Sequence, residues 1–115
     1  MATMKKLSTI EHLDGALTAS AGKPLLLFKH STRCPISARA NYEMEAYLQG
    51  APVSNVEYGI IYVVEDRPVS NEAAARLNVK HESPQVILVK DGKAVWDTSH
   101  GSITSVRLQE ELGRI

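Results

Sequence analysis

The apolar positions of the chain follow two patterns, helical spacing and short unbroken runs, and turn-forming residues separate them. Helical spacing, as at Ile10, Leu13 and Leu17, predicts four helices. They cover residues 8–22, 35–48, 70–77 and a last segment that begins at Ser102 or Thr104 and ends near Gly113. Unbroken runs of apolar and β-branched residues predict four strands, over 25–28, 57–64, 86–89 and 94–96.

Cap and turn residues support these boundaries. Ser8–Glu11 has the pattern of a capping box, in which the first and fourth side chains satisfy free N–H groups at a helix start. Pro24 separates the first helix from the first strand, because proline cannot continue a helix. Asp91 and Gly92 predict a tight hairpin between the last two strands, because such a turn requires positive φ angles at both positions.

The predicted order, α-β-α-β-α-β-β-α, indicates an α/β fold. A strand, a helix and a second strand predict a parallel pair joined by a right-handed crossover, and the hairpin adds an antiparallel pair. We therefore expect a four-stranded mixed sheet with helices on both faces. The 115 residues fit one domain, 1–115, and contain no internal repeat.

Charge and composition narrow the function classes. Thirteen Lys and Arg balance thirteen Asp and Glu, so no overall field attracts nucleic acid or an anionic membrane surface. We expect neither as a partner. No apolar stretch is long enough to span a bilayer, and a single cysteine favours a reducing compartment, so we expect a cytoplasmic protein.

The single cysteine, Cys34, is predicted at the junction between the first strand and the second helix, with Pro35 suited to the first helical turn. A helix N-terminus has free N–H groups and a partial positive charge, which favour the reactive thiolate over the thiol. Arg33 can add to this effect, as can Lys29 and His30 if their side chains turn inward. The alternative is that Cys34 is a small buried side chain without chemistry, which its polar surroundings disfavour.

Ser37 stands where a C-x-x-C oxidoreductase has its second cysteine. A hydroxyl cannot resolve a mixed disulfide. Two roles remain open: Ser37 donates a hydrogen bond to the Cys34 thiolate, or it is a polar residue that shapes the junction.

Histidines do not add a metal site to this pattern. His12, His81 and His100 lie in separate segments without paired spacing, so a zinc site lacks ligands. His30 is the histidine nearest to Cys34 in sequence, but no third group is apparent that would orient a Cys-His pair for acyl transfer. We interpret it as a polar residue at a strand end.

Two separated features resemble the thioredoxin fold. The junction Thr32–Ser37 falls where that fold carries its redox motif, and Ser83-Pro84-Gln85 falls where it carries a proline that is usually cis. The resemblance covers nearly the whole chain. It implies that Ser83 and Pro84 flank the sulfur of Cys34 and that the residue before the proline offers its backbone to a substrate.

Within that group, the stretch Lys29-His30-Ser31-Thr32-Arg33-Cys34-Pro35-Ile36-Ser37 resembles the Thr-x-Cys-Pro-Ile-Ser signature of the monothiol bacilliredoxins. The resemblance implies that Cys34 removes bacillithiol from mixed disulfides on client proteins and takes the adduct onto itself. It implies no permanently bound cofactor, with bacillithiol as the thiol co-substrate and bacillithiolated proteins as partners.

Substrate contacts follow from the same resemblance. Bacillithiol is a cysteinyl-sugar-malate conjugate, and guanidinium groups bind carboxylates in a bidentate fashion. We expect its carboxylates to meet Arg33, together with Lys29 or Lys80. The expected substrate-binding residues are Thr32, Arg33, Ser83 and Pro84.

Three other functions stay open from the sequence. The protein is a glutaredoxin-like reductase for another low-molecular-weight thiol, or an iron-sulfur binding module formed by two subunits, or a thioredoxin-fold partner protein in which Cys34 is idle. Pro35 in place of glycine restricts the close approach that an iron-sulfur cluster needs.

Overall fold

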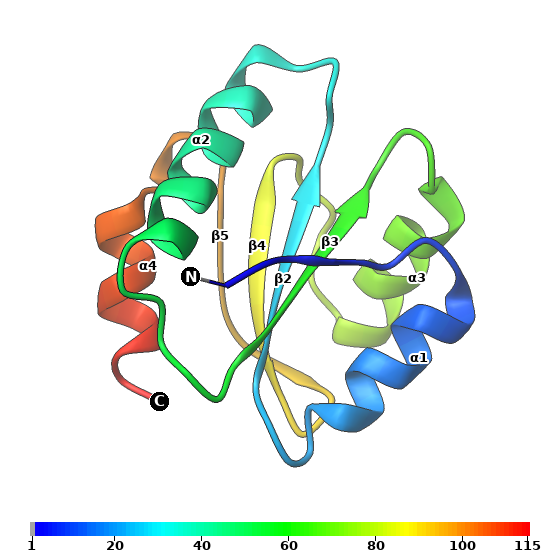
Figure 1. Ribbon diagram of the computed structural model, residues 1–115. Coiled ribbons are helices and arrows are strands. Elements are labelled where there is room, and N and C mark those ends of the chain that lie inside the picture. Colours follow the sequence, from blue (N-terminus) through cyan, green and yellow to red (C-terminus); the bar gives the residue numbers. More distant parts are fainter. Residues whose placement is uncertain (1) are drawn as a thin grey trace.

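The computed structural model describes residues 2–115 and shows a mixed β-sheet between two layers of helices (Figure 1). The elements are β1 (Lys5–Lys6), α1 (Ile10–Ala19), β2 (Leu25–His30), α2 (Pro35–Gln49), β3 (Glu57–Tyr62), α3 (Arg67–Leu77), β4 (Gln85–Lys90), β5 (Lys93–Ser99), the 3₁₀ turn η1 (His100–Ser102) and α4 (Ser105–Leu112). The strand order is β1-β3-β2-β4-β5. The predicted α/β class with helices on both faces is confirmed.

The sheet has five strands, so the expected four-stranded sheet is wrong. The additional strand is β1, which pairs in parallel with β3 through Lys5 opposite Gly59 and Lys6 opposite Ile60. The N–H of Leu7 continues the ladder by donating to the Ile60 carbonyl at 2.9 Å. No sequence pattern predicts β1, because its two exposed lysines show no alternation and the strand forms by backbone pairing.

The predicted parallel pair and terminal hairpin are both present, and the structure adds a pairing of β2 with β4 that the sequence did not predict. β2 and β3 are parallel, β2 and β4 are antiparallel, and β4 and β5 form an antiparallel hairpin. Asp91 and Gly92 have φ angles of 53° and 72°, which are the positive values that the turn requires. At the last helix, Thr104 is the N-cap and its side chain accepts a hydrogen bond from the N–H of Arg107.

Several boundaries differ from the predicted ones; β5, for example, is Lys93–Ser99 where 94–96 is predicted. Two of the differences have a clear local cause. α3 begins at Arg67, three residues before Ser70, because Pro68 fits the first helical turn, where its missing N–H has no helical partner to lose. β3 ends at Tyr62, because Val63 and Val64 already belong to the turn that leads into α3.

Alternation along β2 sends its side chains into two cores. Leu26 and Phe28 pack in the core beneath α2 and α4, whereas Leu25 and Leu27 pack in the core beneath α1 and α3 (Figure 1). All six residues of β2 are buried. Each buried leucine or phenylalanine contributes about 1.5–3 kcal/mol, so this strand anchors the segment that follows it, residues 31–34.

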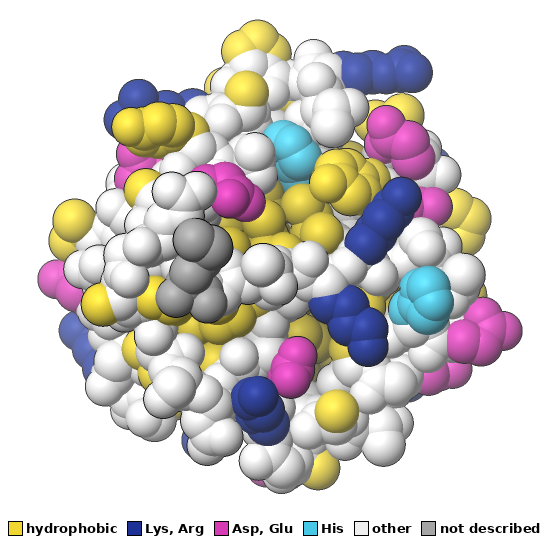
Figure 2. Space-filling model, viewed as in Figure 1, with side chains coloured by type: hydrophobic (Ala, Val, Ile, Leu, Met, Phe, Trp, Pro, Cys, Tyr) yellow, Lys and Arg dark blue, Asp and Glu magenta, His cyan; other side chains and the backbone are white. Residues whose placement is uncertain are grey.

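The surface carries both signs of charge. Figure 2 shows Lys and Arg side chains interspersed with Asp and Glu over the face that the N-terminal segment crosses. Among the helices of residues 2–115, none is both long and apolar enough to cross a membrane.

Candidate active site

Cys34 is the N-cap of α2, with extended φ and ψ angles of −114° and 122°. Its N–H donates to the Ser31 carbonyl at 3.4 Å, and its carbonyl accepts from the N–H of Ala38 at 3.0 Å. Pro35 is the first helical residue. The cysteine is half-buried and lies at the positive end of α2, where the sequence predicts it.

Ser37 fastens the first turn of α2 to the end of β2. Its hydroxyl oxygen accepts from the N–H of Ser31 at 2.9 Å and lies 2.7 Å from Nδ1 of His30. Because the oxygen already accepts one hydrogen bond, its own proton is available to a neutral His30. Of the two roles that the sequence leaves open, these hydrogen bonds correspond to the junction role; among residues 2–115 no hydrogen bond joins Ser37 to the sulfur of Cys34.

His30 is part of the same junction. Its ring stacks on Phe28 at 5.3 Å between ring centroids and tilts against Tyr62 at 5.9 Å. Burial lowers the pKa of His30 below its usual 6.5, against the opposing effect of Glu65. A neutral imidazole is therefore available at neutral pH to accept a hydrogen bond from the Ser37 hydroxyl, a contact that the sequence pattern did not reveal.

Thr32 and Arg33 form the exposed turn that precedes the sulfur. The Thr32 hydroxyl donates weakly to Glu65 at 3.5 Å, and the N–H of Arg33 donates to the Ser31 hydroxyl at 3.3 Å. Within residues 2–115, no carboxylate forms an ion pair with the Arg33 guanidinium. Its five N–H donors are thus available to a ligand beside Cys34.

The Ser83–Pro84 peptide bond is cis, as the thioredoxin resemblance implied. It leads directly into β4, whose first residue, Gln85, lies opposite Lys29 near the end of β2. The start of β4 and the end of β2 therefore share one edge of the sheet, which is also the edge where Cys34 lies. That Ser83 and Pro84 flank the sulfur stays a prediction.

Lys29 differs from expectation. Its side chain is 0 % exposed, and Nζ lies 2.7 Å from Nδ1 of His81. Alternation along β2 turns it into the layer beneath α1 and α3, so it is not available to the carboxylates of a bound thiol. Lys80 is exposed, and its contact with those carboxylates stays a prediction. Burial lowers the pKa of Lys29 from 10.5 to about 8.

Replacement of Lys29 by methionine is expected to stabilise the fold at pH 7. The lowering of its pKa from 10.5 to about 8 corresponds to about 3 kcal/mol, because one pKa unit equals about 1.4 kcal/mol. Replacing buried charges by apolar residues of similar size often raises the free energy of unfolding by about 1–4 kcal/mol. We expect an increase of about 1–3 kcal/mol in the free energy of unfolding, measured by urea denaturation, with no comparable increase for Lys90→Met at an exposed lysine.

The pH dependence gives a second measure of the same change. Between about pH 8 and 10.5 the unfolded chain binds a proton at Lys29 that the folded chain lacks, so wild-type stability rises with pH over this window. The part of this rise in the free energy of unfolding that Lys29 causes should be absent in Lys29→Met. If the free energy of unfolding changes with pH equally in the two proteins over this window, burial of the Lys29 charge does not destabilise the fold.

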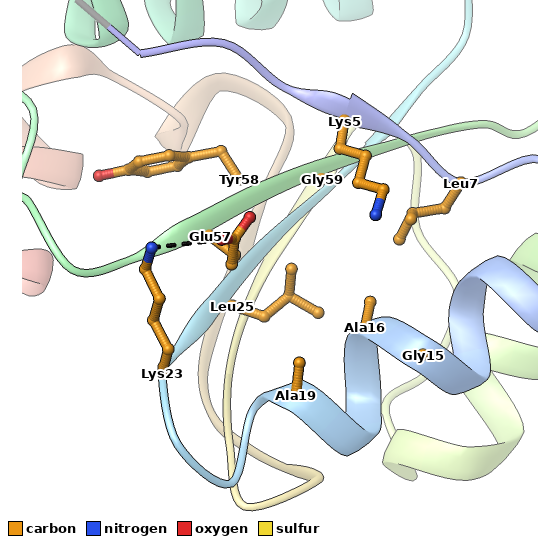
Figure 3. Close-up of a pocket in the computed structure, with 10 residues that line it drawn as sticks. All are labelled: Lys5, Leu7, Gly15, Ala16, Ala19, Lys23, Leu25, Glu57, Tyr58 and Gly59. Carbon is orange, nitrogen blue, oxygen red and sulfur yellow. Dashed lines mark hydrogen bonds and ion pairs between the residues drawn. The ribbon is translucent and has the colours of Figure 1, made fainter.

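The pocket in Figure 3 lies away from this site. It has a volume of about 220 Å³ between α1 and the strands β1 and β3, and an ion pair of 3.2 Å between Lys23 and Glu57 lies at its margin. Leu25 and Glu57 begin β2 and β3, whereas Cys34 follows the end of β2. The pocket is therefore at the opposite edge of the sheet. Among residues 2–115, no three His, Cys, Asp or Glu side chains lie so as to hold a metal ion.

Comparisons with known proteins show the family and the fold of the chain. The sequence model of the family described as monothiol bacilliredoxin BrxC matches residues 5–108. A solved thioredoxin-fold protein, proposed to be an oxidoreductase, is 32% identical with a TM-score of 0.80, and the match covers 93% of this chain and 91% of that one.

More distant solved structures show the fold alone. Thioredoxin of Fasciola hepatica is 22% identical with a TM-score of 0.74, over 96% of this chain and 98% of that one. Thioredoxin of Trypanosoma brucei brucei is 10% identical with a TM-score of 0.77, over 97% and 89% of the two chains.

Proposed function

The chain belongs to the monothiol bacilliredoxin family, and from this premise we propose that it removes bacillithiol from mixed disulfides on client proteins through Cys34. Family and fold support a thiol-disulfide oxidoreductase in general. The observation that carries the proposal is a half-buried lone cysteine at a helix N-terminus, beside an exposed arginine that forms no ion pair with a carboxylate among residues 2–115.

The chemistry needs no oxidant. The Cys34 thiolate attacks the bacillithiol sulfur of the mixed disulfide, and the client cysteine leaves as a thiolate that takes up a proton. One disulfide forms and one breaks. The chain has one cysteine, so it cannot expel bacillithiol itself, and a second thiol from solution must attack the adduct to restore Cys34.

Intact-mass spectrometry tests the proposal directly. Wild-type protein mixed with a bacillithiolated client should gain the mass of one bacillithiol minus two hydrogens while the client loses it. Protein whose Cys34 has been blocked with iodoacetamide is the control and should gain nothing. The same client carrying glutathione or coenzyme A serves for comparison. Equal transfer from the glutathione adduct would favour the glutaredoxin-like alternative, and client release without an adduct on Cys34 would contradict the mechanism.

Arg33→Ala is expected to lower the rate of adduct transfer about tenfold at low salt. Charge-assisted hydrogen bonds contribute about 1.5–3 kcal/mol, and 1.4 kcal/mol corresponds to tenfold. Arg39→Ala is the matched control, because Arg39 is an exposed arginine of α2 that already pairs with Glu43 at 3.3 Å. Since salt screens exposed charges, the difference between the two variants should shrink at high salt. An unchanged rate for Arg33→Ala at low salt would remove this residue from the binding site.

A further inference from the structure

Two buried side chains hold the loop that carries the cis proline, residues 79–84. The Lys29 ammonium lies 2.7 Å from Nδ1 of His81, and the Gln85 amide donates to the Lys80 carbonyl at 3.0 Å. Lys29 and Gln85 lie opposite each other in the ladder between β2 and β4, so their side chains share one face of the sheet. The neighbouring strands thus hold consecutive residues of the loop from beneath.

Burial of Lys29 at this position carries a large desolvation penalty. The lysine side chain is fully buried, and within residues 2–115 it forms no ion pair with a carboxylate. An apolar side chain would fill the same space with less loss of solvation. In the part of the chain that the structure describes, its one hydrogen-bond partner is a histidine of the loop that leads into Ser83 and Pro84.

We infer that Lys29 is a positioning residue: through His81 it fixes the cis-proline loop at the edge of the sheet where Cys34 lies, and so sets how a mixed disulfide is presented to the sulfur. This inference rests on the proposed function, because the loop matters only if a disulfide substrate lies along it. Cys34 performs the exchange, and Lys29 touches neither sulfur nor substrate.

The hydrogen bond depends on the protonation state of His81. Nδ1 can accept from the ammonium only while the ring is neutral. Three charged groups act on this ring: Lys29 from β2, Arg67 at the start of α3 and Glu82 in the loop itself. Burial and the two cations lower the pKa of His81 below 6.5, against the opposing effect of Glu82. At neutral pH the contact is intact. At a pH low enough to protonate His81, the contact breaks, because the imidazolium and the Lys29 ammonium repel each other.

Steady-state kinetics with a bacillithiolated client peptide test the inference. Lys29→Met and His81→Ala should lower kcat/KM at least about fivefold, mainly through a higher KM, because the loop presents the substrate and does not react. His81→Gln retains an acceptor oxygen but does not titrate, so it should keep most of the wild-type kcat/KM at pH 7. In the wild type, kcat/KM should fall on acidification as His81 becomes protonated. His81→Gln should not show this part of the fall, because glutamine does not titrate. Lys90→Met, an exposed lysine on β4, is the matched control.

A second readout does not require activity. NMR titration of the His81 ring should give a pKa below the ordinary histidine value in the wild type, and a higher one in Lys29→Met. If wild-type protein takes no bacillithiol, the proposed function fails while this titration still reports the contact. If the wild type is active, Lys29→Met matching Lys90→Met in kcat/KM at every pH would overturn the positioning role. Should Lys29→Met not fold, equal kinetics for His81→Ala and His81→Gln would overturn it instead.

Discussion

Replacement of Cys34 by serine is expected to reduce bacillithiol transfer to the uncatalysed background. A hydroxyl is not ionised at neutral pH and cannot form a disulfide, and the chain has no other sulfur nucleophile of this kind. The measurement is the rate at which a bacillithiolated client is released, together with the absence of an adduct on the variant.

The geometry separates this loss from misfolding. Cys34 is the N-cap of α2 and its side chain makes no capping hydrogen bond. Serine is among the preferred N-cap residues and typically adds about 1 kcal/mol relative to a residue that does not cap. Cys34→Ser should therefore unfold at the same or a higher temperature than the wild type while it loses activity. A variant that still accelerates client release would show that Cys34 is idle and that the proposed function is wrong.

The sequence was sufficient for the parts of the molecule that local patterns define. The buried run of β2, the proline at the start of α2 and the Asp91-Gly92 turn each carry a physical signal within a few residues. The first two of these predicted where Cys34 lies. β1 escaped prediction because its two exposed lysines form a strand only by pairing with the backbone of β3.

The parts of the site that depend on register were not predictable in the same way. The contact between Lys29 and His81 joins residues 52 positions apart, and it requires the antiparallel pairing of β2 with β4. From its place at the end of a predicted strand, Lys29 is expected to face a ligand, and its burial contradicts this expectation. One signal was present: alternation along β2 puts Lys29 on the same face as Leu25 and Leu27, which are buried.

Ser37→Cys is expected to convert the protein from a monothiol into a dithiol exchanger. Cys34 caps α2 and residue 37 lies in its first turn, which is the C-x-x-C arrangement. After Cys34 has taken up bacillithiol, the new thiolate attacks the Cys34 sulfur, the disulfide between residues 34 and 37 forms, and bacillithiol leaves as a thiolate that takes up a proton. Mass spectrometry should show a chain two hydrogens lighter in place of the long-lived adduct.

Ser37→Ala is the matched control for this change. Both substitutions remove the hydroxyl that accepts from the buried N–H of Ser31, so both should lower the free energy of unfolding by about 1–3 kcal/mol. The alanine variant should still accumulate the adduct on Cys34, because it has no second thiol. Only the cysteine variant should release free bacillithiol without an added thiol. If the bacillithiol adduct on Cys34 is as long-lived in Ser37→Cys as in Ser37→Ala, the dependence on an added thiol has a cause other than the absence of a second cysteine.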